Sequence, residues 1–359
     1  MPASFDIASK DGGYRVSVES GLAARALSRQ DEAIVLHDAF FAALVAPLGN
    51  KSVSIVADER HKSLDAVPAV ISRMRELGTN RHTHLIAVGG GVIQDIAAFC
   101  AAVFMRGLSW SYLPTTLLAM ADSCIGGKSS INVGSYKNLV GTINPPKQVL
   151  IDPDFVRSLS DEQMIDGFCE AAKICFCRDA KTFEKYLALD ARPGMAGQAL
   201  EMMLCLTLDA KRWFIEIDEF DRRERLLLNF GHTFGHAIES ASDFRMSHGC
   251  AVGLGILCAI NLGAKMGVGY SGYASVRRLE KYIKDLLATV PHTANRLAGV
   301  TAQQCLAHCL ADKKHETNNF VFIVVNSDGV VERRRLAKTD ENRRIIVDAF
   351  AEVLGKYQS

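Results

Sequence analysis

Short apolar runs alternate with helical patterns through the first third of the chain, and this alternation constrains the fold more than any other feature. The pattern predicts strands at residues 33–36, 52–57, 84–88 and 109–113, and helices at 39–46, 66–77 and 92–104. Strands separated by helices usually form a parallel sheet, because a crossover helix returns the chain to the same edge. We therefore expect an α/β domain with a doubly wound, mostly parallel sheet.

The second half of the chain has a different periodicity. Residues 162–290 are mostly helical in pattern, and a short pair of strands near 320–325 and 330–334 precedes a final helix at 341–354. A chain of 359 residues is long for one domain. We expect an α/β domain over residues 1–152, a mainly helical domain over 153–359, and an active site in the cleft between them.

Composition excludes several classes of partner. The formal net charge is +1, which does not favour nucleic acid or an anionic membrane surface. The longest apolar runs, such as residues 251–262, contain glycines and are too short to span a bilayer, and the amino terminus lacks the pattern of a signal peptide. The ten cysteines are scattered through predicted helices. We expect a cytoplasmic protein with reduced cysteines and with neither nucleic acid nor membrane as partner.

Three glycines in a row indicate a phosphate-binding turn. Gly89, Gly90 and Gly91 follow a predicted strand and open a predicted helix that carries Asp95 in its first turn. Such a turn lets phosphate oxygens approach the backbone and the helix N-terminus. The motif differs from the G-x-G-x-x-G fingerprint of dinucleotide-binding proteins. An ordinary tight turn would explain one or two glycines, but it explains three in a row less well. Asp38 ends the first strand, where it could bind a ribose hydroxyl; taken alone, a helix cap is the better interpretation.

A second glycine-containing stretch, residues 122–129, superficially suggests a P-loop. That motif needs glycine at position 122, where Asp122 stands and would repel a phosphate. Lys128, Lys137 and Asn138 instead resemble groups that a loop supplies to an anionic substrate. A solvated side chain is the alternative for each lysine taken singly.

Histidines in the second half indicate a metal site. His232 and His236 are four residues apart and so share a helix face, and His248 follows a loop-like segment. Earlier in the chain, Glu170 and Lys173 also share a helix face. Imidazoles with one carboxylate suit zinc or a similar divalent ion, and spacing alone allows His236 to serve either the metal or a substrate.

Together these residues resemble the 3-dehydroquinate synthases and related sugar-phosphate cyclases. The matching blocks follow the family order and cover most of the chain: 89–95, Met105-Arg106-Gly107, 113–118, 122–128, 137–141, Glu170-x-x-Lys173, Arg225-x-x-x-Asn229-x-Gly-His232-x-x-x-His236, His248-Gly249 and Asp312-Lys313-Lys314. One departure is Cys250, a neutral thiol where the family usually has a glutamate after His-Gly.

The resemblance implies roles for individual residues. Zinc, or cobalt, would be held by Glu170, His232 and His248, with positions open for substrate oxygens. NAD would be held by Asp38, Glu59, Lys62, Gly89, Gly90, Gly91, Asp95, Thr115, Thr116, Asp122, Lys128 and Lys137. The substrate would meet Arg106, Asp122, Lys128, Asn138, Lys211, Arg225, Asn229, His236, Lys313 and Lys314. The catalytic set would be Lys128, Glu170, Lys173, Lys211, Arg225, Asn229 and His236. Arg106 would reach the neighbouring subunit's phosphate site, which implies a homodimer.

The resemblance also implies a reaction. Family members eliminate phosphate and close a carbocycle, with NAD returned unchanged. Lys211, Arg225 and Asn229 match the type that takes a carboxylated substrate, so we expect conversion of 3-deoxy-arabino-heptulosonate 7-phosphate to 3-dehydroquinate and phosphate in the shikimate pathway of aromatic amino acid biosynthesis. An amino analogue or sedoheptulose 7-phosphate is the alternative substrate. A polyol dehydrogenase or an inactive binding paralogue fits less well, because the anion-binding residues are present.

Overall fold

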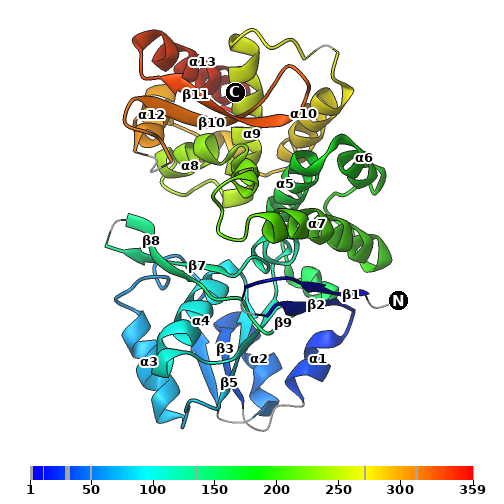
Figure 1. Ribbon diagram of the computed structural model, residues 1–359, viewed down its shortest axis with the longest axis vertical. Helices are drawn as coiled ribbons and strands as arrows, with labels where there is room; N and C mark the ends of the chain where they lie inside the picture. Colours follow the sequence, from blue (N-terminus) through cyan, green and yellow to red (C-terminus); the bar gives the residue numbers. More distant parts are fainter. Residues whose placement is uncertain are drawn as a thin grey trace. The chain divides into compact units, whose positions relative to one another are not determined.

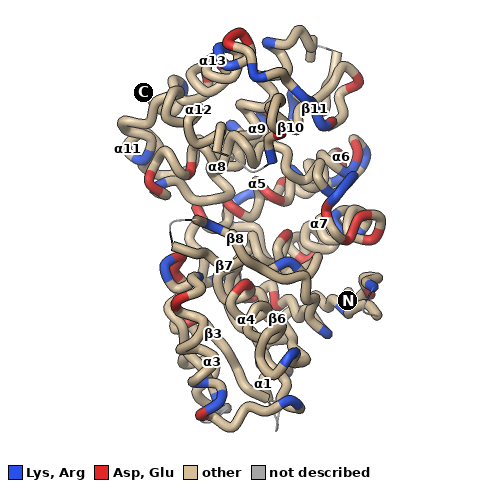
Figure 2. The backbone as a smooth tube through the Cα atoms, turned by 60° about the vertical axis from the view of Figure 1, so that its left-hand side comes forward, with Lys and Arg blue, Asp and Glu red and all other residues tan. Residues whose placement is uncertain are grey.

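The structure, a computed structural model, describes residues 3–10, 12–28, 33–48, 51–134, 136–270, 272–311 and 314–358. The chain forms two compact units. Unit 1 comprises Met1–Leu159 and Met195–Glu219, and unit 2 comprises Ser160–Gly194 and Phe220–Ser359. The division into domains at residues 152 and 153, and the active site between them, stay predictions. Basic and acidic positions are interspersed along the chain in both units (Figure 2).

Unit 1 is built on a seven-stranded sheet with the order β1-β2-β9-β6-β5-β3-β4 (Figure 1). The strands are β1 (Ala3–Ile7), β2 (Tyr14–Val18), β3 (Ala33–Asp38), β4 (Ser52–Ile55), β5 (His84–Gly89), β6 (Trp110–Pro114) and β9 (Gln148–Ile151). All neighbouring pairs are parallel except β1 with β2. The mostly parallel sheet predicted from the sequence is therefore confirmed.

Helices cover this sheet. They are α1 (Leu22–Leu27), α2 (Ala42–Val45), α3 (Val67–Glu76) and α4 (Gly91–Val103), with α7 (Gly197–Ile217) contributed by the later segment. Ala23, Leu27 and Val45 from α1 and α2 pack with strand residues such as Val35 and Val88 in one buried cluster. Short 3₁₀ segments occur at Ala39–Phe41, Ala46–Leu48, Phe104–Arg106 and Pro153–Ser158, and a π-helical turn at Ala119–Ser123.

A two-stranded hairpin completes unit 1. Strand β7 (Lys128–Val133) pairs with β8 (Tyr136–Ile143) in antiparallel register, and Lys128 lies opposite Ile143. The predicted loop around Lys128, Lys137 and Asn138 is thus a pair of strands. Most residues of β8 are exposed, so the alternation of apolar and polar residues that identifies a half-buried strand is missing there.

Unit 2 is mainly helical, as predicted. Its helices are α5 (Asp161–Arg178), α6 (Ala180–Ala188), α8 (His232–Ala241), α9 (His248–Lys265), α10 (Ala274–Leu287), α11 (Thr293–Arg296), α12 (Ala302–Leu310) and α13 (Asp340–Tyr357). A 3₁₀ segment spans Glu224–Asn229, and β10 (Asn319–Val325) pairs with β11 (Val331–Ala337) in antiparallel register, which confirms the predicted pair of strands.

Helix α9 is the central element of unit 2. It contacts α5, α8, α10, α13 and β10. Among the described residues it is the one helix long and apolar enough to cross a membrane by length and composition, but 78% of that window is buried inside the protein. Its composition is therefore that of a core helix. Because α5 and α8 both pack directly on α9, the polar side chains of the three helices can converge on one point.

Candidate functional site

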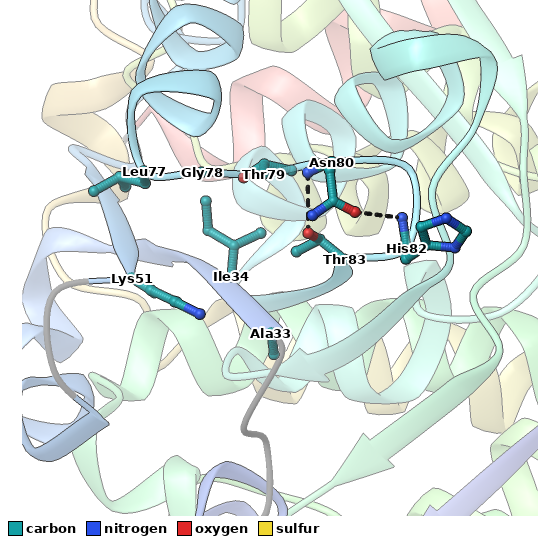
Figure 3. Close-up of a pocket in the computed structure, with 9 residues that line it drawn as sticks. All are labelled: Ala33, Ile34, Lys51, Leu77, Gly78, Thr79, Asn80, His82 and Thr83. Atoms are coloured by element: carbon teal, nitrogen blue, oxygen red, sulfur yellow. Dashed lines mark hydrogen bonds between the residues drawn. The ribbon is translucent and has the colours of Figure 1, made fainter.

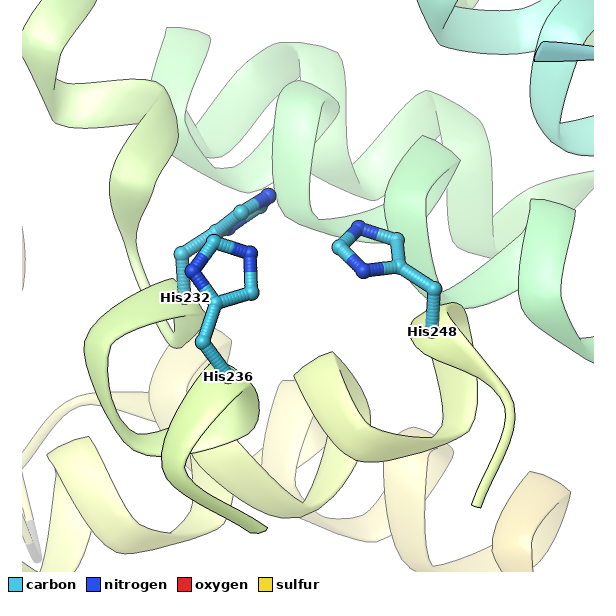
Figure 4. Close-up of side chains that lie close together, drawn as sticks. All are labelled: His232, His236 and His248. Atoms are coloured by element: carbon cyan, nitrogen blue, oxygen red, sulfur yellow. The ribbon is translucent and has the colours of Figure 1, made fainter. Parts of the chain in front are cut away.

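Three histidines converge in unit 2. His232 is the first residue of α8 and His236 lies one turn later, while His248 is the first residue of α9. One ring nitrogen from each lies within 4.8 Å of the others. Figure 4 shows the rings of His232 and His236 facing that of His248 across the gap between the two helices.

A buried carboxylate from a third helix joins them. Glu170 lies on α5 with 1% of its surface exposed, and its Oε1 atom is 3.5 Å from His232 Nε2 and 3.4 Å from His248 Nε2. Among the described residues, Oε1 has no hydrogen-bond partner of good geometry. Ligand atoms held about 2.0–2.2 Å from a tetrahedral zinc lie about 3.3–3.6 Å from one another. The two distances from Glu170 Oε1 therefore match the spacing between ligand atoms around one metal.

The two proposed imidazole ligands have opposite electrostatic environments. Burial, followed by the charges of Lys173 and the other histidines, lowers the pKa of His232 well below its usual value. Burial would also lower the pKa of His248, but the Glu170 and Glu239 carboxylates outweigh it and raise this pKa to about 10. In the metal-free protein at neutral pH, His248 therefore carries a proton that a metal must displace.

Glu239 is a site residue that the sequence analysis missed. It lies on α8, and its Oε2 atom is 3.4 Å from His248 Nδ1, on the ring side opposite Glu170. A carboxylate at the second nitrogen fixes the orientation of a ligand imidazole. Glu239 follows His232 by seven residues and His236 by three, so it shares their helix face, and this spacing could have identified it.

Cationic and amide side chains surround the cluster. Lys173 is buried one turn after Glu170 and donates to its second carboxylate oxygen. Lys314 is half-buried and lies near enough to contribute to the lowered pKa of His232. Arg225 is buried in the 3₁₀ segment that packs on α5, and Asn229 at the end of that segment donates to the carbonyl of Leu226 at 3.0 Å. Lys313 lies outside the described residues.

The glycine turn in unit 1 joins β5 to α4 as predicted. Gly89 ends the strand, and a Cβ atom there would lie 2.5 Å from Ile93. Gly90 caps the helix, and its Cβ would lie 2.9 Å from Thr116. A Cβ at Gly91 would meet nothing within 4 Å. The turn is thus closely packed behind its first two glycines and open beside the third, at the start of a helix where an anion is stabilised.

Residues proposed to bind NAD flank this turn. The Thr115 amide donates to the carbonyl of Gly89 at 3.0 Å, and the hydroxyl of Thr116 accepts from the backbone of Ala119 at 3.2 Å. Asp38 ends β3, next to β5 in the sheet, and caps the following 3₁₀ turn by accepting from the Phe40 amide at 3.1 Å. The helix-capping role that the sequence suggested for Asp38 is therefore present, and it uses one oxygen of the carboxylate.

A hydrogen-bonded network gathers the remaining NAD residues with Asn138. Lys62 Nζ donates to Asp95 Oδ2 at 3.1 Å and to Asn138 Oδ1 at 2.9 Å, and it lies 3.4 Å from Glu59 Oε1. Lys137 Nζ is 3.9 Å from the same Glu59 oxygen. Burial raises the pKa of Asp95, although the Lys62 charge opposes this. The network connects the helix after the glycine turn to the β7–β8 hairpin.

Lys211 and Asp122 form a second polar pair in unit 1. Lys211 is buried on α7, forms an ion pair with the Asp122 carboxylate, and donates to the carbonyls of Asp122 at 2.5 Å and Ile125 at 3.2 Å. Lys128 is exposed at the start of β7. Arg106 is exposed beyond α4 with a φ of 72°, directly after Met105 with a φ of 47°. Two successive non-glycine residues in the left-handed region are uncommon and occur most often at functional positions.

Unit 1 also contains a pocket of about 380 Å³ at the start of β3 (Figure 3). Its lining includes Lys51, Thr79, Asn80 and His82, and it contains none of the predicted site residues. The glycine turn follows the opposite, carboxyl end of the neighbouring parallel strand β5. Ligands of open α/β sheets bind at the carboxyl ends of the strands, so this pocket does not compete as the NAD site.

Comparison with known proteins agrees with this geometry. Residues 52–166 match the 3-dehydroquinate synthase N-terminal family, and residues 167–315 match the 3-dehydroquinate synthase C-terminal family. A 3-dehydroquinate synthase from Xanthomonas oryzae is 34% identical over 289 residues, which cover 77% of this chain and 75% of that protein. The two family matches together cover residues 52–315, which contain all the motifs on which the resemblance was based, from the glycine turn to the histidine cluster.

Solved structures share the fold. A 2-deoxy-scyllo-inosose synthase complexed with carbaglucose-6-phosphate, NAD+ and Co2+ superposes with a TM-score of 0.85 and 22% identity over 98% of this chain and 99% of that one. ValA, a 2-epi-5-epi-valiolone synthase from Streptomyces hygroscopicus with NAD+ and Zn2+ bound, gives 0.78 and 23% over 97% and 99%. The family matches, the relative and the shared fold lead to one conclusion: the chain belongs to the 3-dehydroquinate synthase family.

Proposed function

We propose that this protein is a phosphate-eliminating cyclase that converts 3-deoxy-arabino-heptulosonate 7-phosphate to 3-dehydroquinate and phosphate. The observation that carries the proposal is the cluster of Glu170, His232 and His248, where a buried carboxylate oxygen lies 3.4–3.5 Å from two imidazole nitrogens. Lys173 satisfies the second oxygen of this carboxylate, but the buried Oε1 atom has no hydrogen bond of good geometry among the described residues. A divalent metal bound between Oε1 and the two imidazoles would satisfy it.

The metal, zinc or cobalt, would be held by Glu170, His232 and His248, and when bound it supplies a Lewis acid for a substrate oxygen. The surrounding side chains orient this set. Lys173 holds the second oxygen of Glu170, so that Oε1 faces the histidines. Glu239 holds the far nitrogen of His248. His236, which has a ring nitrogen within 4.8 Å of ring nitrogens of both other histidines, would bind a substrate hydroxyl beside the metal.

NAD would occupy the carboxyl edge of the sheet in unit 1, where it supplies a reversible acceptor of hydride. The open helix N-terminus at Gly91 suits a pyrophosphate, and the Asp38 carboxylate at the end of the adjacent strand suits a ribose hydroxyl. The rest of the proposed NAD set consists of Glu59, Lys62, Gly89, Gly90, Asp95, Thr115, Thr116, Asp122, Lys128 and Lys137. The structures of two cyclases of this fold contain NAD+ with Co2+ or Zn2+, which supports the same pair of cofactors here.

The cationic residues suit a substrate with a phosphate at one end and a carboxylate at the other. We assign the carboxylate to Arg225, whose planar guanidinium can bind both oxygens of a carboxylate, with Asn229 in the same 3₁₀ segment. Lys128, Lys211 and Lys314 would contact the substrate's other polar groups, together with Asp122, Asn138 and Lys313. A buried guanidinium favours a charged partner over a neutral hydroxyl, so the carboxylated heptulosonate is preferred over sedoheptulose 7-phosphate.

The proposal extends to assembly and location. Arg106, exposed on a left-handed turn, would reach the phosphate site of a second copy in a homodimer. None of the ten cysteines, all of which lie among the described residues, forms a disulfide bond, which suits the reducing cytoplasm.

The reaction is tested by incubating the purified protein with substrate, Zn2+ and an amount of NAD far below that of the substrate. We expect one phosphate released per substrate, 3-dehydroquinate identified by mass spectrometry, and no net NADH. Removal of the metal by a chelator should stop phosphate release, and added Zn2+ should restore it. Conversion of all the supplied NAD to NADH, with no phosphate released, would instead identify a dehydrogenase.

A further inference from the structure

The first turn of α9 is capped by a side chain from another helix. Ser247 occupies the cap position, where a serine hydroxyl normally accepts a hydrogen bond from the helix's own first turn, but it makes no such bond. Its hydroxyl instead donates to Asp166 Oδ1 at 2.7 Å, and the same oxygen accepts from the backbone N–H of Cys250 at 2.8 Å. Asp166, from α5, thus takes the role that Ser247 would have.

The sequence of α9 itself supplies no carboxylate to cap its first turn. Cys250 is the third residue of the helix, the position at which a glutamate or glutamine closes a capping box with the serine. A thiol cannot accept the serine's backbone N–H as a carboxylate does. The carboxylate at this helix end therefore comes from Asp166, and it is also favoured there by the dipole of α9.

The two helices touch at this point. A Cβ atom at Gly249 would lie 2.3 Å from the carbonyl oxygen of Asp166 and 2.4 Å from its Cα, so no residue larger than glycine fits. Asp166 precedes Glu170 by one helical turn, and Gly249 directly follows His248. The contact between α5 and α9 therefore lies next to two of the three proposed metal ligands.

We propose that Asp166 is a positioning residue of the metal site, which holds the first turn of α9 against α5 and thereby sets His248 Nε2 at its distance from Glu170 Oε1. This inference rests on the metal site of the proposed function. Metal–ligand distances stay within about 0.2 Å of their ideal values, so the residue that carries a ligand must be held in place. The N–H groups of a helix's first turn have no partner inside the helix, and Asp166 supplies one to the turn that carries His248.

The test is zinc affinity, measured by competition with a chelating dye in the full-length protein without NAD or substrate. Asp166→Ala should weaken zinc binding by about 10- to 100-fold, the usual effect of losing a residue that orients a ligand. Asp166→Asn keeps an acceptor oxygen and should bind zinc with the affinity of the unaltered protein. Thermal melting of the metal-free proteins, run in parallel, measures the effect on folding alone.

Asp179→Ala is the matched control. Asp179 caps α6 in the same unit by accepting from the Thr182 backbone at 2.7 Å, and it is not among the proposed ligands. It should lower the melting temperature as Asp166→Ala does but leave zinc affinity unchanged. Normal zinc affinity in Asp166→Ala, or an equal loss in Asp179→Ala, would overturn the proposal.

A further variant keeps the test decisive if Asp166→Ala does not fold. Ser247→Ala removes one of the two donors to Asp166 and should weaken zinc binding by a few-fold, about threefold; no change would count against the proposal. Because the zinc measurement contains no substrate, its result does not depend on the outcome of the cyclase assay. If the unaltered protein binds no zinc, the positioning role of Asp166 is wrong, whatever the activity of the protein.

Discussion

The crossing of α8 and α9 determines the histidine cluster, and glycines make it possible. A Cβ atom added at Gly255 would lie 2.0 Å from the carbonyl oxygen of Gly231 and 2.6 Å from the backbone nitrogen of Gly235. Ordinary contact begins at 3.4 Å, so Gly255→Ala must move the two backbones apart by more than an ångström. That movement separates His232 on α8 from His248 on α9.

The expected cost follows from what surrounds the added methyl group. Overpacking usually costs about 1–3 kcal/mol when side chains can shift. Here the nearest atoms at Gly255 are backbone atoms, so we expect the upper end, about 3 kcal/mol, and a fall in melting temperature of roughly 6–12 °C for a unit of this size. Because ligand distances must hold within about 0.2 Å, zinc affinity should fall at least about tenfold.

The assay combines thermal melting of the metal-free protein, followed by circular dichroism, with zinc competition against a chelating dye. Gly355→Ala is the matched control, because it makes the same substitution in α13 of the same unit, where the added Cβ meets nothing within 4 Å. It should be about 0.5–1 kcal/mol more stable and bind zinc normally. If Gly255→Ala melts and binds zinc like the unaltered protein, the close packing inferred for α8 and α9 is wrong.

Three further predictions concern the site. The His248→Ala variant should lose its zinc, as measured by atomic absorption. Full zinc content in this variant would show that another residue is the third ligand. Arg225→Ala should lower kcat/KM for the carboxylated substrate by at least about thirtyfold with zinc content intact, because a buried charge partner is lost; an unchanged substrate preference would contradict its role. Since the pKa of His248 is raised to about 10 in the metal-free protein, zinc must displace its proton. Zinc affinity should therefore rise about tenfold per unit between about pH 6 and 8, and a flat profile would contradict this assignment.

The parts of the fold that the sequence predicted are those with a continuous apolar pattern. Strands β3, β5 and β6 are buried almost throughout, and so their residues are mostly apolar, in unbroken runs in β3 and β5 and with one serine in β6. Strands β1 and β2 at the edge of the sheet alternate buried and exposed residues over only five positions each, and they were missed. The helix predicted at 39–46 is a short α-helix between two 3₁₀ turns, because Pro47 cannot donate a helical hydrogen bond.

The same limit applies to the site. Local spacing on one helix predicted that His232 and His236 share a face, and the family motifs added Glu170 and His248. Glu239 lies on the same helix face and was overlooked. Asp166 could not be found in that way, because it lies on α5 and acts on the start of another helix, α9. Contacts between helices depend on how the helices cross, and glycines such as Gly249 allow the crossing without showing which side chains it brings together.

The proposed reaction of this protein is dehydroquinate synthase chemistry on a carboxylated sugar phosphate. The most direct measurement is phosphate release by the purified, zinc-loaded protein with catalytic NAD, offered 3-deoxy-arabino-heptulosonate 7-phosphate and sedoheptulose 7-phosphate in parallel. We predict turnover of the first substrate alone, without net NADH. Turnover of sedoheptulose 7-phosphate only, or of neither substrate, would contradict the proposed function.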